Sequence, residues 1–138
     1  MSLKSLKIRL PQSQRLVHPH QIFERLTLRG PISSLWSPQA EALQSWHENR
    51  QKPDVVVQMN TGGGKTLVGL LIAQSITNET FGKTLYVCPT NQLVEQTAEI
   101  AEHCNLNYST YASGRWTKPE NFESNTGPCI TNYAAVFN

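Results

Sequence analysis

The segment at residues 59–66, M-N-T-G-G-G-K-T, places three consecutive glycines directly before a lysine and a threonine. Residues 55–57, just before it, are three valines, and residues 67–73, just after it, are apolar apart from one glycine. Consecutive β-branched residues favour a strand that is covered on both faces, as in parallel sheets. A helix that is apolar all round is usually buried. The sequence therefore predicts a glycine turn between a buried strand and a buried helix.

A turn of this composition suits a phosphate group. Glycines allow successive backbone N–H groups to point inward at an anion, and the N-terminus of the following helix adds about half a positive charge. Lys65 can reach the terminal phosphates of ATP, and the Thr66 hydroxyl can ligate Mg²⁺. We therefore expect ATP and Mg²⁺ as cofactors, Lys65 and Thr66 as catalytic residues and Thr66 as the metal ligand. The predicted phosphate-binding residues are Asn60, Thr61, Gly62, Gly63, Gly64, Lys65 and Thr66. Met59 stands where the strict pattern has a glycine.

Helices and strands are predicted to alternate along the chain. Ser37 as N-cap and Pro38 at the first position start a helix that runs to about residue 50. A strand at 84–88 and a helix at 92–103 follow, and further strands are predicted at 108–111 and 128–131, with a helix starting at 133. Residues 6–10 alternate apolar and basic side chains, as a half-exposed strand does, and residues 114–126 read as a polar loop. This order predicts an α/β fold with a parallel sheet flanked by helices.

The segment after the strand at 84–88 carries the resemblance to a known family. Residues 89–96 read P-T-N-Q-L-V-E-Q and fit the pattern P-T-x-x-L-x-x-Q. Together with the glycine turn upstream, this resembles superfamily 2 helicases of the DEAD/DEAH-box-like group, which have a RecA-like P-loop NTPase fold. The resemblance implies that Pro89 and Thr90 lie nearest to the backbone of bound DNA or RNA and that Gln96 supports them. Thr131, at a strand end, resembles a further backbone contact of the family.

Gln39 resembles the glutamine with which this family reads adenine. A side-chain amide has one donor and one acceptor side, which matches N6 and N7 of the base. The resemblance implies an aromatic residue stacked on the base, and Phe23 and Trp36 are both candidates for this role and for the core.

The family also implies parts that the sequence does not contain. Its catalytic carboxylates form an Asp-Glu pair after the elements named above, whereas the only aspartate here is Asp54. We therefore expect the chain to be truncated before the Walker B strand, with residues 1–36 as an N-terminal extension leading into the adenine-recognition segment and 37–138 as an incomplete first RecA-like domain. A second RecA-like domain is an expected partner, and hydrolysis by these residues alone should be negligible.

The resemblance implies an ATP-dependent helicase or translocase. A motor subunit of a restriction or antiphage system, moving on duplex without unwinding it, is an alternative in the same superfamily. From other classes, a phosphate-loop kinase fits the P-T-x-x-L-x-x-Q segment poorly, and a non-catalytic nucleotide-binding module remains open.

Composition adds little to these expectations. The net charge of +2 is small, although residues 1–30 hold six bases and one acid and could meet phosphates. The three cysteines form no CxxC pair, which favours a reducing cytoplasm over a zinc or disulfide framework. No apolar run is long enough to span a membrane. Residues 113–116, S-G-R-W, could contact a strand through charge and stacking or be an ordinary loop.

Overall fold

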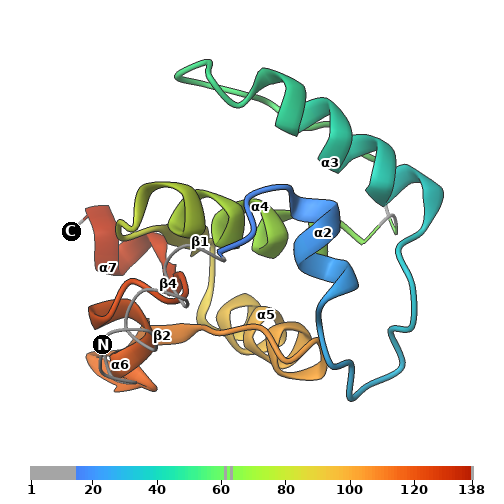
Figure 1. The fold of residues 1–138 in the computed structure, drawn as a ribbon. Helices are drawn as coiled ribbons and strands as arrows, with labels where there is room; N and C mark the ends of the chain where they lie inside the picture. The colour runs from blue at the N-terminus through green and yellow to red at the C-terminus, as the bar shows by residue number, and fades with distance from the viewer. Residues whose placement is uncertain (1–14, 61, 63, 138) are drawn as a thin grey trace, which may run out of the picture.

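The computed structural model describes residues 15–60, 62 and 64–137 (Figure 1), so the strand predicted at residues 6–10 lies outside the described residues. Helices and strands alternate through most of the chain, as predicted. The elements are α2 (Pro19–Glu24), α3 (Ser37–Asn49), α4 (Lys65–Thr80), β1 (Leu85–Cys88), α5 (Asn91–His103), β2 (Ser109–Ala112), β3 (Arg115–Thr117), α6 (Pro119–Glu123), β4 (Cys129–Asn132) and α7 (Tyr133–Phe137).

The four strands form one sheet in the order β1-β4-β2-β3. The β4 strand runs parallel to both β1 and β2, and β3 runs antiparallel to β2. This confirms the predicted α/β class and its parallel sheet. Because β1, β4 and β2 point the same way, their carboxyl ends meet at one edge, where Cys88 pairs with Asn132.

The α4 helix is the centre of the molecule. Figure 1 shows it between α3 and α5, and it also packs against α2 and β1. Leu67, Val68, Leu70 and Leu71 are all buried, with Leu71 fully inaccessible. The prediction of a buried helix directly after the glycine turn is therefore confirmed.

The prediction of a buried strand at residues 55–57 is wrong. These residues form no strand, and Val56 is 93% exposed. The segment instead runs beside α3, where residues 55–60 line a groove of about 490 Å³ together with Pro38, Glu41 and Trp46. β-branched residues favour extended backbone, but a strand also needs a neighbour with free hydrogen-bonding groups, and this segment pairs with none of the described strands.

The prediction of a loop at residues 114–126 is also wrong. Ser113 and Gly114 both have positive φ, 54° and 72°, and form a two-residue turn that joins β2 to β3. Two such residues give the turn whose twist matches a hairpin. Pro119 then occupies the first position of α6, which is where proline suits a helix.

The segment before α4 is part of the core. Ile22 and Phe23 of α2 are buried, and Leu43 of α3 is fully inaccessible. The α3 helix begins as predicted, except that Trp36 is the N-cap and Ser37 is the first helical residue. At its other end, Arg50 forms an ion pair with Glu79 of α4, with 3.3 Å between Nε and Oε2.

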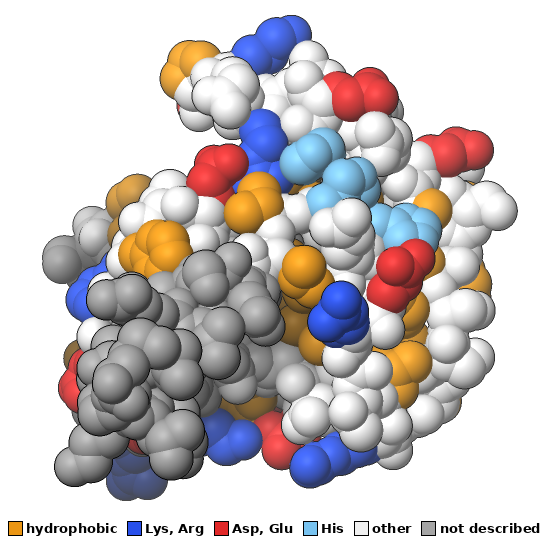
Figure 2. All heavy atoms as spheres, viewed as in Figure 1, with side chains coloured by type: hydrophobic (Ala, Val, Ile, Leu, Met, Phe, Trp, Pro, Cys, Tyr) orange, Lys and Arg blue, Asp and Glu red, His pale blue; other side chains and the backbone are white. Residues whose placement is uncertain are grey.

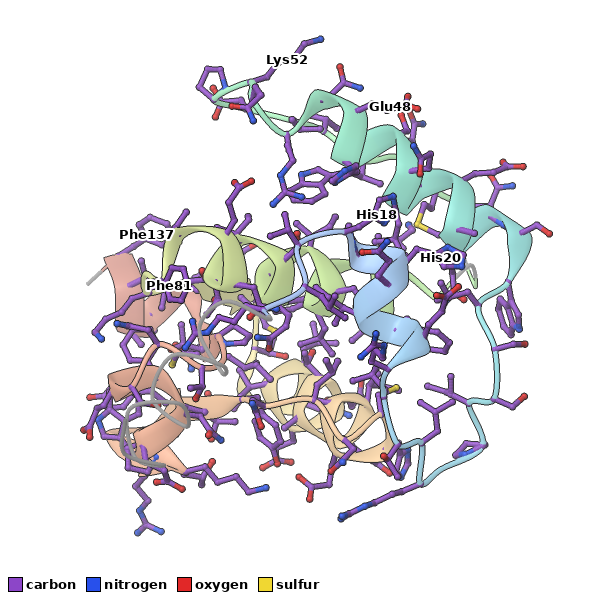
Figure 3. The ribbon with its side chains drawn as sticks, viewed as in Figure 1. His18, His20, Glu48, Lys52, Phe81 and Phe137 are labelled. Atoms are coloured by element: carbon purple, nitrogen blue, oxygen red, sulfur yellow. The ribbon has the colours of Figure 1, made fainter. Side chains whose placement is uncertain are left out.

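Histidines gather where α2 meets α3, and their side chains form a patch on the face shown in Figure 2. The rings of His18 and His47 lie 4.2 Å apart between centroids, and Figure 3 shows His18 between the two helices, with His20 on α2. His47 Nδ1 lies 2.9 Å from Arg50 Nη1. Because a guanidinium only donates, this nitrogen of His47 must accept and therefore carries no proton.

We expect the stability of the fold to decrease in acid because of His47. Burial, His18 and Arg50 lower the pKa of His47 in the folded chain, against weaker opposing effects of Glu79 and Glu48. The unfolded chain therefore binds the proton more readily, and this contribution to stability is complete above about pH 6.5 and is lost as the pH falls below it. Urea denaturation at pH 7.5 and at lower pH measures the effect. A His47→Asn variant, which keeps an acceptor for Arg50, should lose less stability on acidification, and an equal loss would contradict the assignment.

The three cysteines are free and buried. Burial raises the pKa of all three thiols, that of Cys129 to about 11. In the described part of the chain, no group of three or more His, Cys, Asp or Glu side chains is placed to hold a metal ion. Within the same residues, every helix is too short or too polar to cross a bilayer.

Candidate functional site

The glycine turn ends in a helix start that no side chain caps. Gly64 precedes α4 with a φ of 77°, and Gly62 has a φ of 82°. Within the described residues, no side chain caps α4 and no acidic residue stands in its first turn, so the first N–H groups keep their capacity to bind an anion. Lys65 is exposed as the first helical residue, and Thr66 is half-buried. Asn60 is exposed just before the turn, whereas Thr61 and Gly63 lie outside the described residues.

Gln39 joins α3 to the glycine turn. Its Nε2 donates to the Gly64 carbonyl at 3.2 Å, and its Oε1 accepts from the Trp36 N–H at 2.8 Å. The side chain is only 5% exposed, and a Cβ atom added to Gly64 would overlap its Nε2. Gly64 is therefore required both for its left-handed backbone and for the close approach of Gln39. One proton and one lone pair of the amide stay unused in these two bonds.

A cavity of about 390 Å³ opens beside the turn. Its walls include Gln39, Gly64, Thr66 and Trp36, and the segment at residues 31–34 closes it on another side. Of the two aromatic candidates for stacking on a base, Trp36 lines this cavity, and Phe23 is buried in the hydrophobic core. The structure thus brings Gln39 and Thr66, 27 positions apart in the sequence, into the wall of one cavity.

Tyr86 is a neighbour of Thr66 that sequence patterns do not indicate. Its ring from β1 lies so close to Gly69 of α4 that an added Cβ would be 2.7 Å from a ring carbon. Thr66 stands one turn before Gly69 on the same face of α4. Burial raises the pKa of the Tyr86 hydroxyl, and hydrogen bonding to Thr66 partly opposes this rise.

Two residues that were predicted to contact nucleic acid lie at the carboxyl end of the sheet. Pro89 and Thr90 follow β1 and are exposed, and Thr90 caps α5 by accepting from the Leu93 N–H at 3.2 Å. Asn132, at the end of the adjacent β4, donates to Asn91 Oδ1. The polar ends of β1 and β4 are therefore joined side by side, and the two asparagines could have been suspected from their positions after strands.

The other two residues predicted to contact nucleic acid, Thr131 and Gln96, are not exposed at the strand ends. Thr131 is 3% exposed, and its hydroxyl donates to the Tyr111 carbonyl at 2.6 Å. Gln96 is exposed further along α5, and no described hydrogen bond joins it to the strand ends. A role for either residue in binding a nucleic-acid strand stays a prediction.

A family model described as "Type III restriction enzyme, res subunit" matches residues 32–138. This span covers both the glycine turn and the joined strand ends. The chain belongs to the type III restriction res-subunit family. The comparison with curated proteins and the comparison with solved structures found no match.

Membership of the res-subunit family confirms a helicase-like P-loop domain of superfamily 2. The narrower assignment to the DEAD/DEAH-box group is not supported by this match. The match begins at Ile32, before α3, and so includes the segment that closes the cavity beside Gly64. In this res-subunit domain, the residues predicted to bind nucleotide lie around the start of α4, and the residues predicted to bind nucleic acid lie around the ends of β1 and β4. The elements α4, α5 and β1 connect these two places.

Proposed function

We propose that the chain binds ATP with Mg²⁺ and grips the backbone of a nucleic-acid strand as part of an ATP-driven motor of the restriction type. The uncapped start of α4, between the left-handed Gly64 and the exposed Lys65, is the observation that carries this proposal. Four N–H groups of a helix start have no partner within the helix, and a phosphate chain supplies acceptors for them. The family match favours a restriction-type motor over a general unwinding helicase.

The residues present fit the parts of ATP and its metal. Lys65 would pair with the terminal phosphates as a point charge, and Thr66 would offer its hydroxyl to Mg²⁺. Gln39 and Trp36 would face the base in the cavity of about 390 Å³ beside Gly64. Bound ATP and Mg²⁺ would supply the phosphoryl-transfer chemistry, and a second RecA-like domain would complete the cleft.

The joined strand ends would hold the nucleic acid. Pro89 and Thr90 would lie against the sugar-phosphate backbone, because a strand end and a helix start offer N–H groups and a hydroxyl to phosphate oxygens. Thr131 would act by holding the end of β4 through its bond to Tyr111, and Gln96 would support α5. The test is ATP turnover by the motor that also includes the Walker B carboxylates and the second RecA-like domain. Turnover that rises when single-stranded or duplex DNA or RNA is added would support the motor, and the absence of such a rise would favour a nucleotide-binding module.

Replacing Lys65 by alanine is expected to weaken the binding of a fluorescent ATP analogue in the presence of Mg²⁺ by about ten- to a hundredfold. A charge-assisted hydrogen bond contributes about 1.5–3 kcal/mol. Lys65 is exposed, so the melting temperature should stay close to that of the unaltered chain. Lys52→Ala is the matched control, because Lys52 is another exposed lysine, in the turn after α3. Equal affinities of the two variants would contradict the proposed phosphate site.

A further inference from the structure

The hairpin of β2 and β3 lies against α5 and is fixed to it at both ends. At the turn, Asn91 Nδ2 donates to Ser113 Oγ at 2.8 Å. At the far end, Lys118 Nζ lies 2.9 Å from Glu102 Oε2, and this ion pair lowers the pKa of Glu102. Two anchors on one helix give the hairpin a defined position relative to Thr90, which starts that helix.

A groove of about 410 Å³ runs between the hairpin and α5. Figure 1 shows α5 and β2 side by side, as their packing contacts require. Its lining includes the polar side chains of Asn91, Glu95, Thr110, Ser113, Arg115 and Thr117, together with Val94, Ala98, Tyr108 and Ala112. It starts at Asn91, directly after Thr90, and is therefore continuous with the joined ends of β1 and β4.

Arg115 is the unneutralised cation of this groove. It is exposed, and in the described part of the chain it forms no ion pair. Lys118, the other base of the hairpin, is neutralised by Glu102. Glu95 also lines the groove but is not paired with Arg115 within the described residues, so its charge opposes an anion there.

Trp116 does not share this groove. Successive residues of a strand point to opposite faces, and Trp116 packs on the other face, 4.9 Å from Tyr111 and 5.8 Å from Phe122 between ring centroids. Tyr108 also lines the groove, but it is only 9% exposed and Lys118 Nζ lies 4.8 Å from the centroid of its ring. The groove therefore offers charge and hydrogen bonds with little aromatic surface for stacking, which suits a sugar-phosphate backbone better than stacked bases.

We propose that the groove between α5 and the β2–β3 hairpin binds the backbone of a nucleic-acid strand that continues from Thr90, with Arg115 contacting a phosphate. This inference rests on the proposed function and adds a binding surface to it. In open α/β sheets, ligands bind outside the carboxyl ends of the strands. The turn at Ser113 and Gly114 follows the carboxyl end of β2, next to the ends of β4 and β1.

The test measures the binding of labelled single-stranded oligothymidine and oligouridine by the whole chain at several salt concentrations. Arg115→Ala should weaken binding about three- to tenfold and reduce the slope of log K against log[salt] by about 0.7, the value for one phosphate contact on a single strand. Arg115→Lys should keep the slope, and Glu95→Gln should strengthen binding. Lys52→Ala, which removes a charge well away from α5 and β2 (Figure 3), should leave the slope unchanged.

The outcomes separate the two proposals. If the unaltered chain binds the oligonucleotides and Arg115→Ala keeps both the affinity and the slope, the groove assignment is overturned and the proposed function stands. If the unaltered chain binds neither oligonucleotide, the nucleic-acid part of the proposed function is overturned together with the groove. A preference between the two oligonucleotides identifies DNA or RNA as the strand. The melting temperatures of Arg115→Ala and Arg115→Lys should agree, so that a difference in slope reports charge and not folding.

Discussion

Replacing Gly64 by alanine is expected to destabilise the fold by about 2–5 kcal/mol and to abolish the phosphate site. A left-handed conformation costs a residue with a Cβ about 1–2 kcal/mol, and Gly64 has a φ of 77°. The new methyl group would also overlap Gln39 Nε2. Displacing this buried amide from the Gly64 carbonyl leaves polar groups without partners, at about 1–3 kcal/mol. Urea denaturation gives the loss of stability, and titration with the ATP analogue gives the loss of binding.

Gly62→Ala is the matched control for this prediction. Gly62 has nearly the same φ, 82°, but an added Cβ would meet no atom within 4 Å. It should therefore cost only the conformational part, about 1–2 kcal/mol. In a Gln39→Ala background, where the obstructing amide is removed, Gly64→Ala should cost no more than Gly62→Ala. Equal costs of the two glycine variants in the unaltered background would show that Gln39 does not pack on the turn.

Replacing Leu43 by alanine is expected to cost about 2–5 kcal/mol, the range for removing a buried leucine side chain. Leu43 is fully inaccessible and joins α3 to the hydrophobic core. Gln39 lies one turn before it on the same face of α3, so a loosened α3 should also withdraw the amide from Gly64. Denaturation midpoints and ATP-analogue affinity measured on the same samples test both effects.

Ser45→Ala controls for the change of helix composition in α3. Ser45 is exposed, and surface substitutions in a helix usually change stability by less than about 0.5 kcal/mol. A cost for Leu43→Ala no larger than that of Ser45→Ala would mean that α3 is not docked on the core. Gln39 would then have no fixed position beside the phosphate turn.

Patterns that depend on neighbouring residues predicted most of the fold. Pro38 at the start of α3 and the apolar run after the glycines each reflect contacts within one element or the burial of its side chains, and these elements appear where expected. The strand expected at residues 55–57 failed for the opposite reason. Its formation depends on a partner strand far away in the sequence, and three valines carry no information about whether one is available.

The hairpin at residues 112–115 was hidden by its composition. Ser113 adopts a left-handed conformation that asparagine or glycine adopts more readily, and its hydroxyl is held by Asn91 from another element. In the candidate site, the residue types of the glycine turn were enough to predict that a buried helix starts directly after it, and its phosphate chemistry stays a prediction. The bond from Gln39 to Gly64, the position of Tyr86 against Gly69 and the burial of Thr131 depend on packing between distant elements, which no single-sequence pattern records.

The burial of Cys88, Cys104 and Cys129 has a consequence for the chemistry of the intact fold. The thiolate is the form that reacts with oxidants and alkylating reagents, and burial both blocks access and suppresses thiolate formation at these positions. The cysteines of a folded molecule therefore resist oxidation without a reducing agent. Any cysteine that becomes modified records an opening of the sheet or of the end of α5.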